Sequence, residues 1–182
     1  MPIAGEAGPT GDELRIQVIE GRPVVHGVMI QGHGPYTFLL DTGAEANSVA
    51  SDLAAAMSWR PAYRVEVASV AAVVWRGAFV ASSVSLGSAQ ADRQEFVIQP
   101  LGEIRGLSRK IDGVLGQAFL GRFNYLLDLR RKRLVFGDLG AAGGPRTPVE
   151  WSHGRMVAST SRGRLVIDSG VNTLILQGAD EL

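Results

Sequence analysis

The sequence of 182 residues is 46% hydrophobic and carries a formal net charge of zero. This length and composition suffice for one domain with a real core, or for one domain with a substantial extension. A net charge of zero gives no indication of a basic surface that binds nucleic acid. Because the sequence contains no cysteine, disulfides, thiolate catalysis and cysteine-based metal sites are excluded.

No apolar run approaches the ~20 residues of a transmembrane helix. The first residues also lack the basic and apolar regions of a signal peptide. We therefore expect a soluble protein without a membrane span, either cytoplasmic or exported with its signal absent from this sequence. The compartment is left open.

Strand patterns dominate the first three quarters of the sequence. Residues 1–12 are rich in Gly, Pro and acidic residues and predict a flexible lead-in. Alternating or Val-rich runs predict strands at 14–19, 23–30, 36–40, 63–67, 73–86, 95–99, 125–129 and 133–136. The best helix candidate is 48–57, a shorter one is 117–123, and 101–110 is predicted to be a loop. The expected fold over 13–137 is all-β with one or two short helices.

A Gly/Pro-rich linker is predicted at 138–148, and the sequence after it repeats the start of the chain. Gly21-Arg-Pro-Val-Val is matched by Gly154-Arg-Met-Val-Ala. The run Leu-Asp41-Thr-Gly is matched by Ile-Asp168-Ser-Gly, so the two aspartates are 127 residues apart. Counterparts of 56–136 do not follow Asp168, and 149–182 is therefore interpreted as an incomplete second repeat.

Two features in a fixed order make this chain resemble the retropepsin-like (clan AA) aspartic peptidases of the bacterial type. The first is the apolar strand that ends in Asp41-Thr-Gly-Ala. The second, ~70 residues later, is Ile111-Asp-Gly-Val-Leu-Gly-Gln-Ala-Phe-Leu. The resemblance covers about residues 14–137 and implies a closed β-barrel lobe followed by the start of a second repeat. It also implies a covering β-hairpin, or flap, for which Ala68–Gly77 is the candidate.

The resemblance implies an aspartic endopeptidase that hydrolyses peptide bonds with a water activated between two aspartates. Two carboxylates held close cannot both ionise, and aspartic proteases are the standard example of such a pair. The predicted catalytic residues are Asp41 and Asp168. The predicted support of the two catalytic loops is Thr42, Gly43, Ala44, Ser169 and Gly170, and the residues predicted to pack behind the first loop are Val114, Leu115 and Gly116.

Neither a cofactor nor a metal is expected, and the expected partner is a peptide or protein substrate. Two assemblies are compatible with the sequence. Asp41 can pair with Asp168 in a two-lobe protein whose second lobe is missing in part, or with its own mate in a homodimer. The alternative function is a catalytically inactive peptidase-like module for binding or dimerisation, since a fold does not fix a function.

Overall fold

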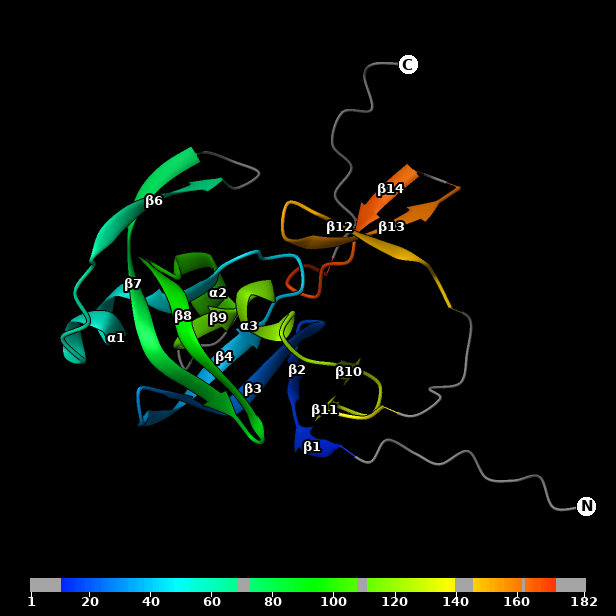
Figure 1. Cartoon of the computed structure of the whole chain (residues 1–182), viewed down its shortest axis with the longest axis horizontal. Coiled ribbons are helices and arrows are strands. Elements are labelled where there is room, and N and C mark those ends of the chain that lie inside the picture. Colours follow the sequence, from blue (N-terminus) through cyan, green and yellow to red (C-terminus); the bar gives the residue numbers. More distant parts are fainter. Residues whose placement is uncertain (1–10, 69–72, 108–110, 140–145, 162, 173–182) are drawn as a thin grey trace, which may run out of the picture.

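The computed structural model describes residues 11–68, 73–107, 111–139, 146–161 and 163–172. Most of these residues lie in β-strands, and the helices are short (Figure 1). The strands of the first part are β1 (Asp12–Arg15), β2 (Gln17–Ile19), β3 (Arg22–Ile30), β4 (His33–Leu40), β5 (Asn47–Ala50), β6 (Tyr63–Ala68), β7 (Val73–Leu86), β8 (Ala89–Gln99), β9 (Gly113–Leu115), β10 (Tyr125–Asp128) and β11 (Arg133–Phe136). The helices are α1 (Ser51–Ala56), α2 (Gly102–Leu107) and α3 (Gln117–Leu120).

The main sheet closes on itself as a barrel. Its strand order is β2-β3-β4-β9-β5-β8-β7-β6, and β3 also pairs with β7 through Met29–Ser85 and Ile30–Val84. This extra pairing joins the two sides of the sheet, so β3, β4, β9, β5, β8 and β7 form a ring without an open edge. The expected closed β-barrel lobe is therefore confirmed.

Aromatic and aliphatic side chains fill this barrel. Phe38, Phe96 and Phe119 are fully buried, and the Phe96 ring packs against both Phe38 and Phe79. A small sheet of order β1-β11-β10 covers one side of the core, with the buried side chains of β11 turned inward. The apolar strands seen in the sequence therefore form two buried clusters, a large one that includes Phe38 and Leu40 and a smaller one that includes Leu39 and Val114.

The end of the described chain forms a separate antiparallel sheet of order β12-β13-β14. These strands are β12 (Val149–Ser152), β13 (Arg155–Thr160) and β14 (Gly163–Val166). Figure 1 shows this sheet beside the barrel, with the segment after β14 returning toward the barrel. That return brings Asp168 to the first loop.

Three local predictions differ from the structure or lie partly outside it. Residues Ser48–Ala50 belong to the buried strand β5 rather than to the helix, because they pair with both β8 and β9. Residues Gly102–Leu107 form α2 instead of a loop. The flap candidate coincides with the β6–β7 hairpin, but its tip at 69–72 lies outside the described residues.

Candidate active site

The first aspartate follows directly on the buried strand β4. Phe38, Leu39 and Leu40 are at most 1% exposed, so their burial fixes the strand and the direction in which it ends. β4 runs parallel to β9, and the N–H of Asp41 donates to the carbonyl oxygen of Leu115 at 3.0 Å. Asp41 is therefore anchored at its backbone by the strand that packs beside it.

Each aspartate carboxylate accepts hydrogen bonds from its own loop. The N–H groups of Gly43 and Ala44 donate to Oδ1 of Asp41 at 2.9 and 3.0 Å. In the second loop, the N–H of Gly170 donates to Oδ1 of Asp168 at 2.7 Å. The Asp-(Thr/Ser)-Gly sequence thus forms two similar turns that hold their carboxylates in place.

The hydroxyl groups of Thr42 and Ser169 join the two loops reciprocally. Thr42 Oγ1 donates to the carbonyl oxygen of Ile167 at 2.7 Å and accepts from the N–H of Ser169 at 3.0 Å. Ser169 Oγ donates to the carbonyl oxygen of Leu40 at 2.8 Å and accepts from the N–H of Thr42 at 3.1 Å. These four bonds lock both loops in one approximately symmetric arrangement within a single chain.

The two glycines allow the carboxyl groups to approach the opposite loop. A Cβ atom placed on Gly43 would overlap the carboxyl group of Asp168, and one placed on Gly170 would overlap that of Asp41. Any larger residue would therefore push the loops apart. The structure brings together both predicted aspartates and all five predicted loop-support residues.

The environment of Asp41 favours its protonated form. Burial, then the charge of Asp168 and then a hydrogen bond with its carboxyl group raise the pKa of Asp41 to about 6, while the N–H groups of Gly43 and Ala44 act in the opposite direction. Asp41 therefore keeps a proton in mildly acidic solution.

The predicted packing behind the first loop is also present, together with two polar residues that were not predicted. Val114 and Leu115 are buried, and a Cβ on Gly116 would meet the carbonyl oxygens of Ala44 and Ala46. The Gly116 N–H donates to Oδ1 of the buried Asn47 at 3.1 Å.

Gln117 is the second polar residue missed in the sequence. Its Nε2 donates to the carbonyl oxygen of Thr42 at 3.0 Å, and its own N–H donates to the carbonyl oxygen of Ala44 at 2.8 Å. The sequence did contain a signal for Gln117, because this amide directly follows the apolar run Gly-Val-Leu-Gly. A buried amide is normally hydrogen-bonded, so a polar residue at that position indicates a structural role.

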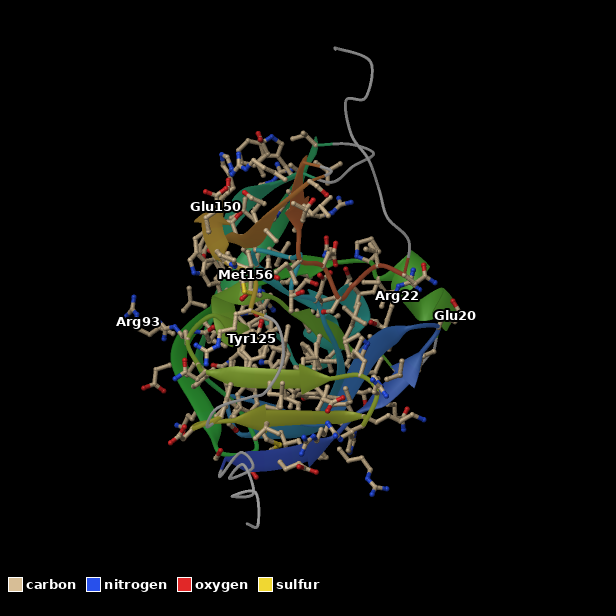
Figure 2. All side chains as sticks on the ribbon, turned by 90° about the vertical axis from the view of Figure 1, so that its right-hand side faces the viewer. Glu20, Arg22, Arg93, Tyr125, Glu150 and Met156 are labelled. Carbon is tan, nitrogen blue, oxygen red and sulfur yellow. The ribbon has the colours of Figure 1, made fainter. Side chains whose placement is uncertain are left out.

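Two hairpin turns brace the loops from outside. Figure 2 shows Glu20 and Arg22 at the end of the β2–β3 hairpin. Arg22 Nε donates to the carbonyl oxygen of Gly170 at 2.7 Å, and Asn172 Nδ2 donates to the carbonyl oxygen of Glu20 at 3.2 Å. On the other side, Gly154 in the β12–β13 turn lies against the side chain of Glu45. Each hairpin therefore contacts the aspartate loop of the other repeat.

Within the described ranges, no group of three or more acidic or histidine side chains is arranged to hold a metal ion. In the same part of the chain, no helix has the length and hydropathy needed to cross a membrane.

Comparisons with known proteins agree with this geometry. The profile of the family described as aspartyl protease matches residues 26–119, slightly more than half of the chain. Among 22 matching chains of solved structures is a retropepsin-like aspartic protease from Rickettsia conorii, with 17% sequence identity and a TM-score of 0.52, covering 69% of this chain and 89% of that one. That likeness supports the fold. No curated protein matches the sequence significantly. By its sequence profile and its retropepsin-like barrel, this chain belongs to the aspartyl protease family.

Proposed function

We propose that the chain is an aspartic endopeptidase in which Asp41 and Asp168 of the same molecule form the catalytic pair. The reciprocal contact of the two loops is the observation that carries the proposal. Each carboxyl group lies against the glycine of the other loop, and Thr42 and Ser169 hold the two backbones together. Such an arrangement keeps two carboxyl groups close enough to share a proton.

The proposed reaction uses this pair as a combined acid and base. The ionised carboxylate removes a proton from a water while the water oxygen attacks the carbonyl carbon of the scissile peptide bond. The protonated carboxyl gives its proton to the carbonyl oxygen, which produces a neutral tetrahedral diol. As the C–N bond breaks, the protonated carboxyl gives its proton to the amide nitrogen and the carboxylate takes a proton from one hydroxyl of the diol. A carboxylic acid and an amine are released, and the pair again holds one proton and one negative charge.

The pKa of Asp41 determines the expected pH range. Because this pKa is raised to about 6, a singly protonated pair persists in mildly acidic solution and is lost as the pH rises above that value. We therefore expect proteolysis to decline toward neutral and alkaline pH.

The same-chain pair is favoured over pairing of two Asp41 residues in a homodimer. A second Asp41 would need the space beside Gly43 that the Asp168 carboxyl group occupies, and the four hydrogen bonds of Thr42 and Ser169 would have to break. We accordingly propose that 13–137 is the peptidase domain, 138–148 the linker and 149–182 the part of a second repeat that supplies Asp168.

Amide variants of the two aspartates test both the activity and the assembly. Cleavage of a broad peptide library is measured by mass spectrometry for the unmodified chain and for Asp41→Asn, Asp168→Asn and the control Asp128→Asn, whose carboxylate pairs with Arg131 and Arg133 outside the two loops. We expect both site variants to be inactive and the control to be active. An equimolar mixture of the two site variants should stay inactive, because neither chain contains both carboxyl groups.

Other outcomes identify the competing interpretations. Activity retained by Asp168→Asn alone would indicate the homodimer built on Asp41. Cleavage that is unaffected by Asp41→Asn would contradict the catalytic role. The absence of cleavage by the unmodified chain across acidic pH would favour the inactive binding or dimerisation module.

A further inference from the structure

The carbonyl oxygen of Thr42 and the N–H of Gly43 belong to one peptide unit, and this unit is hydrogen-bonded at both ends. Gln117 Nε2 donates to the carbonyl oxygen of Thr42 at 3.0 Å. The N–H of Gly43 donates to Oδ1 of Asp41 at 2.9 Å. A continuous chain of hydrogen bonds therefore runs from the side chain of Gln117 through the backbone to the carboxyl group of Asp41.

The orientation of the Gln117 amide in this chain follows from its surroundings. Gln117 is 6% exposed, and its own N–H donates to the carbonyl oxygen of Ala44 at 2.8 Å. Only the Nε2 end of the side-chain amide carries protons, so the opposite orientation would place Oε1 against the Thr42 carbonyl oxygen. The amide is therefore a donor toward the loop, and its Oε1 atom needs a donor from elsewhere.

Tyr125 on β10 is placed to provide that donor. The Tyr125 hydroxyl and Oε1 of Gln117 are both buried, and neither atom has a hydrogen-bond partner at standard distance and angle among the described residues. The two side chains do interact: burial raises the pKa of Tyr125, and the amide of Gln117 acts in the opposite direction. Because the hydroxyl can turn its proton toward an acceptor, each group can satisfy the other.

Polarisation along such a chain has a defined sign at Asp41. A donor on the Thr42 carbonyl oxygen withdraws electron density from the peptide unit and makes the Gly43 N–H a stronger donor. This N–H lowers the pKa of Asp41, against the larger effects of burial and of Asp168. Gln117 therefore favours the ionised form of Asp41 and acts on it through the backbone.

We infer that Gln117 is a positioning residue that adjusts the acidity of Asp41 through the peptide unit between Thr42 and Gly43. Tyr125 completes the chain by holding the Gln117 amide in its donor orientation. The effect on the carboxyl group is a property of the folded chain, whereas its consequence for cleavage rests on the proposed function.

The charged groups around Asp41 act separately from this chain. Asp168 in the facing loop raises the pKa of Asp41 directly. Arg22 of β3 donates to the second loop, and Glu45 lies against the β12–β13 turn. In the described structure, the peptide unit is bonded by the amide and the Asp41 carboxyl group rather than by these three side chains. A change in the amide should therefore alter the acidity of Asp41 while these charges stay in place.

NMR of the ¹³C,¹⁵N-labelled full chain tests the inference on the carboxyl group itself. The side-chain carboxyl carbon of Asp41 is titrated in the unmodified chain and in Gln117→Met. We expect the variant to raise the pKa of Asp41 by about 0.3 of a pH unit and to move the Gly43 amide proton upfield. The Ala44 amide proton is an internal control, because it bonds the same Oδ1 atom at 3.0 Å but belongs to the next peptide unit.

Tyr125→Phe removes one hydroxyl group and tests the outer end of the chain. We expect a smaller rise in the pKa of Asp41, and no further rise when this change is added to Gln117→Met, because Tyr125 acts only through Gln117. The control for lost packing is Phe119→Leu in the same helix, α3. It should lower the free energy of unfolding without changing the titration of Asp41.

Several results would overturn the inference. One is an unchanged Asp41 titration in Gln117→Met, once circular dichroism shows that this variant is folded. Another is an equal movement of the Gly43 and Ala44 amide protons, which would indicate a displaced loop. If Gln117→Met does not fold, Tyr125→Phe decides alone, and an unchanged titration in that variant contradicts the chain.

Cleavage provides a separate readout. In an active chain, the alkaline limb of the pH dependence of kcat should move to higher pH in Gln117→Met by the same amount as the Asp41 titration. An inactive chain with a shifted titration would refute the proposed function and support the inference. An active chain with an unshifted titration would do the reverse.

Discussion

The raised pKa of Asp41 predicts that removing its charge stabilises the protein at neutral pH. The pKa of this carboxyl group rises from 3.8 to about 6 on folding. Between these values the folded chain keeps a proton that the unfolded chain has lost, so the free energy of unfolding falls as the pH rises through this window. A difference of about two pKa units corresponds to about 3 kcal/mol, all of which has been lost at pH 7.

The variant Asp41→Asn should escape this loss. Asn retains an Oδ1 atom that can accept the N–H groups of Gly43 and Ala44, which lie 2.9 and 3.0 Å from the Asp41 oxygen. It carries no charge to be desolvated beside Asp168. We therefore expect Asp41→Asn to exceed the unmodified chain in unfolding free energy by up to about 3 kcal/mol at pH 7 and to approach it near pH 4.

Urea unfolding followed by tryptophan fluorescence between pH 4 and 7 measures this difference. The control is Asp128→Asn, because the backbone N–H of Arg131 and the neighbouring arginines lower the pKa of Asp128. That group contributes stability that is present above its unfolded pKa and lost on acidification, so its removal should destabilise the chain at pH 7. If Asp41→Asn were no more stable than the unmodified chain at pH 7, or if its advantage were the same at pH 4, the two carboxyl groups would not be held as the structure has them.

Three further predictions concern the geometry of the loops. Gly43→Ala should reduce the rate of proteolysis by on the order of 10²-fold, because the added Cβ would overlap the Asp168 carboxyl group. The control is Gly102→Ala, whose added Cβ has no atom within 4 Å and should leave the rate of cleavage unchanged. Thr42→Val removes a donor to Ile167 and an acceptor for Ser169, so it should lower the free energy of unfolding in urea by about 2 kcal/mol. Thr42→Ser keeps the hydroxyl group and should restore most of this free energy. An equal decrease in both variants would argue against these bonds. Arg22→Lys removes the Nε donor to the second loop. We expect kcat to fall with little change in KM, and the pH dependence of kcat to shift. A lower kcat with an unchanged pH dependence would contradict a role of Arg22 in positioning Asp168.

The two aspartate loops could be recognised from the sequence because each is marked by a short motif of adjacent residues. Asp41 and Asp168 each follow an apolar strand and precede a hydroxyl residue and a glycine, and the run Gly-Val-Leu-Gly marks β9 without reference to the rest of the fold. The resemblance to the family also indicated Thr42 and Ser169 as support for the two loops. Whether Asp41 meets Asp168 or a second Asp41 could not be decided, since this depends on how a distant segment folds back.

The sequence-based predictions failed where contacts between distant segments determine the structure more strongly than local residue preferences do. The segment 48–57 contains good helix formers, yet its first residues form β5 because two neighbouring strands offer hydrogen bonds and burial. Asn47 and Gln117 were missed as support for the loops because a single buried amide has no spacing pattern to reveal its partners. Arg22 was missed for a similar reason, as its acceptor lies 148 residues away.

Because the two loops belong to one polypeptide, their association does not depend on the concentration of the protein. Thr42 and Ser169 belong to one polypeptide, so their encounter is intramolecular and its effective concentration is set by the segment between β11 and β12, not by the amount of protein. Two groups joined in one chain can reach effective concentrations on the order of millimolar, far above those of most proteins in a cell. Dilution should therefore leave the specific activity of this chain constant, while an enzyme assembled from two separate chains would lose activity as its subunits dissociate.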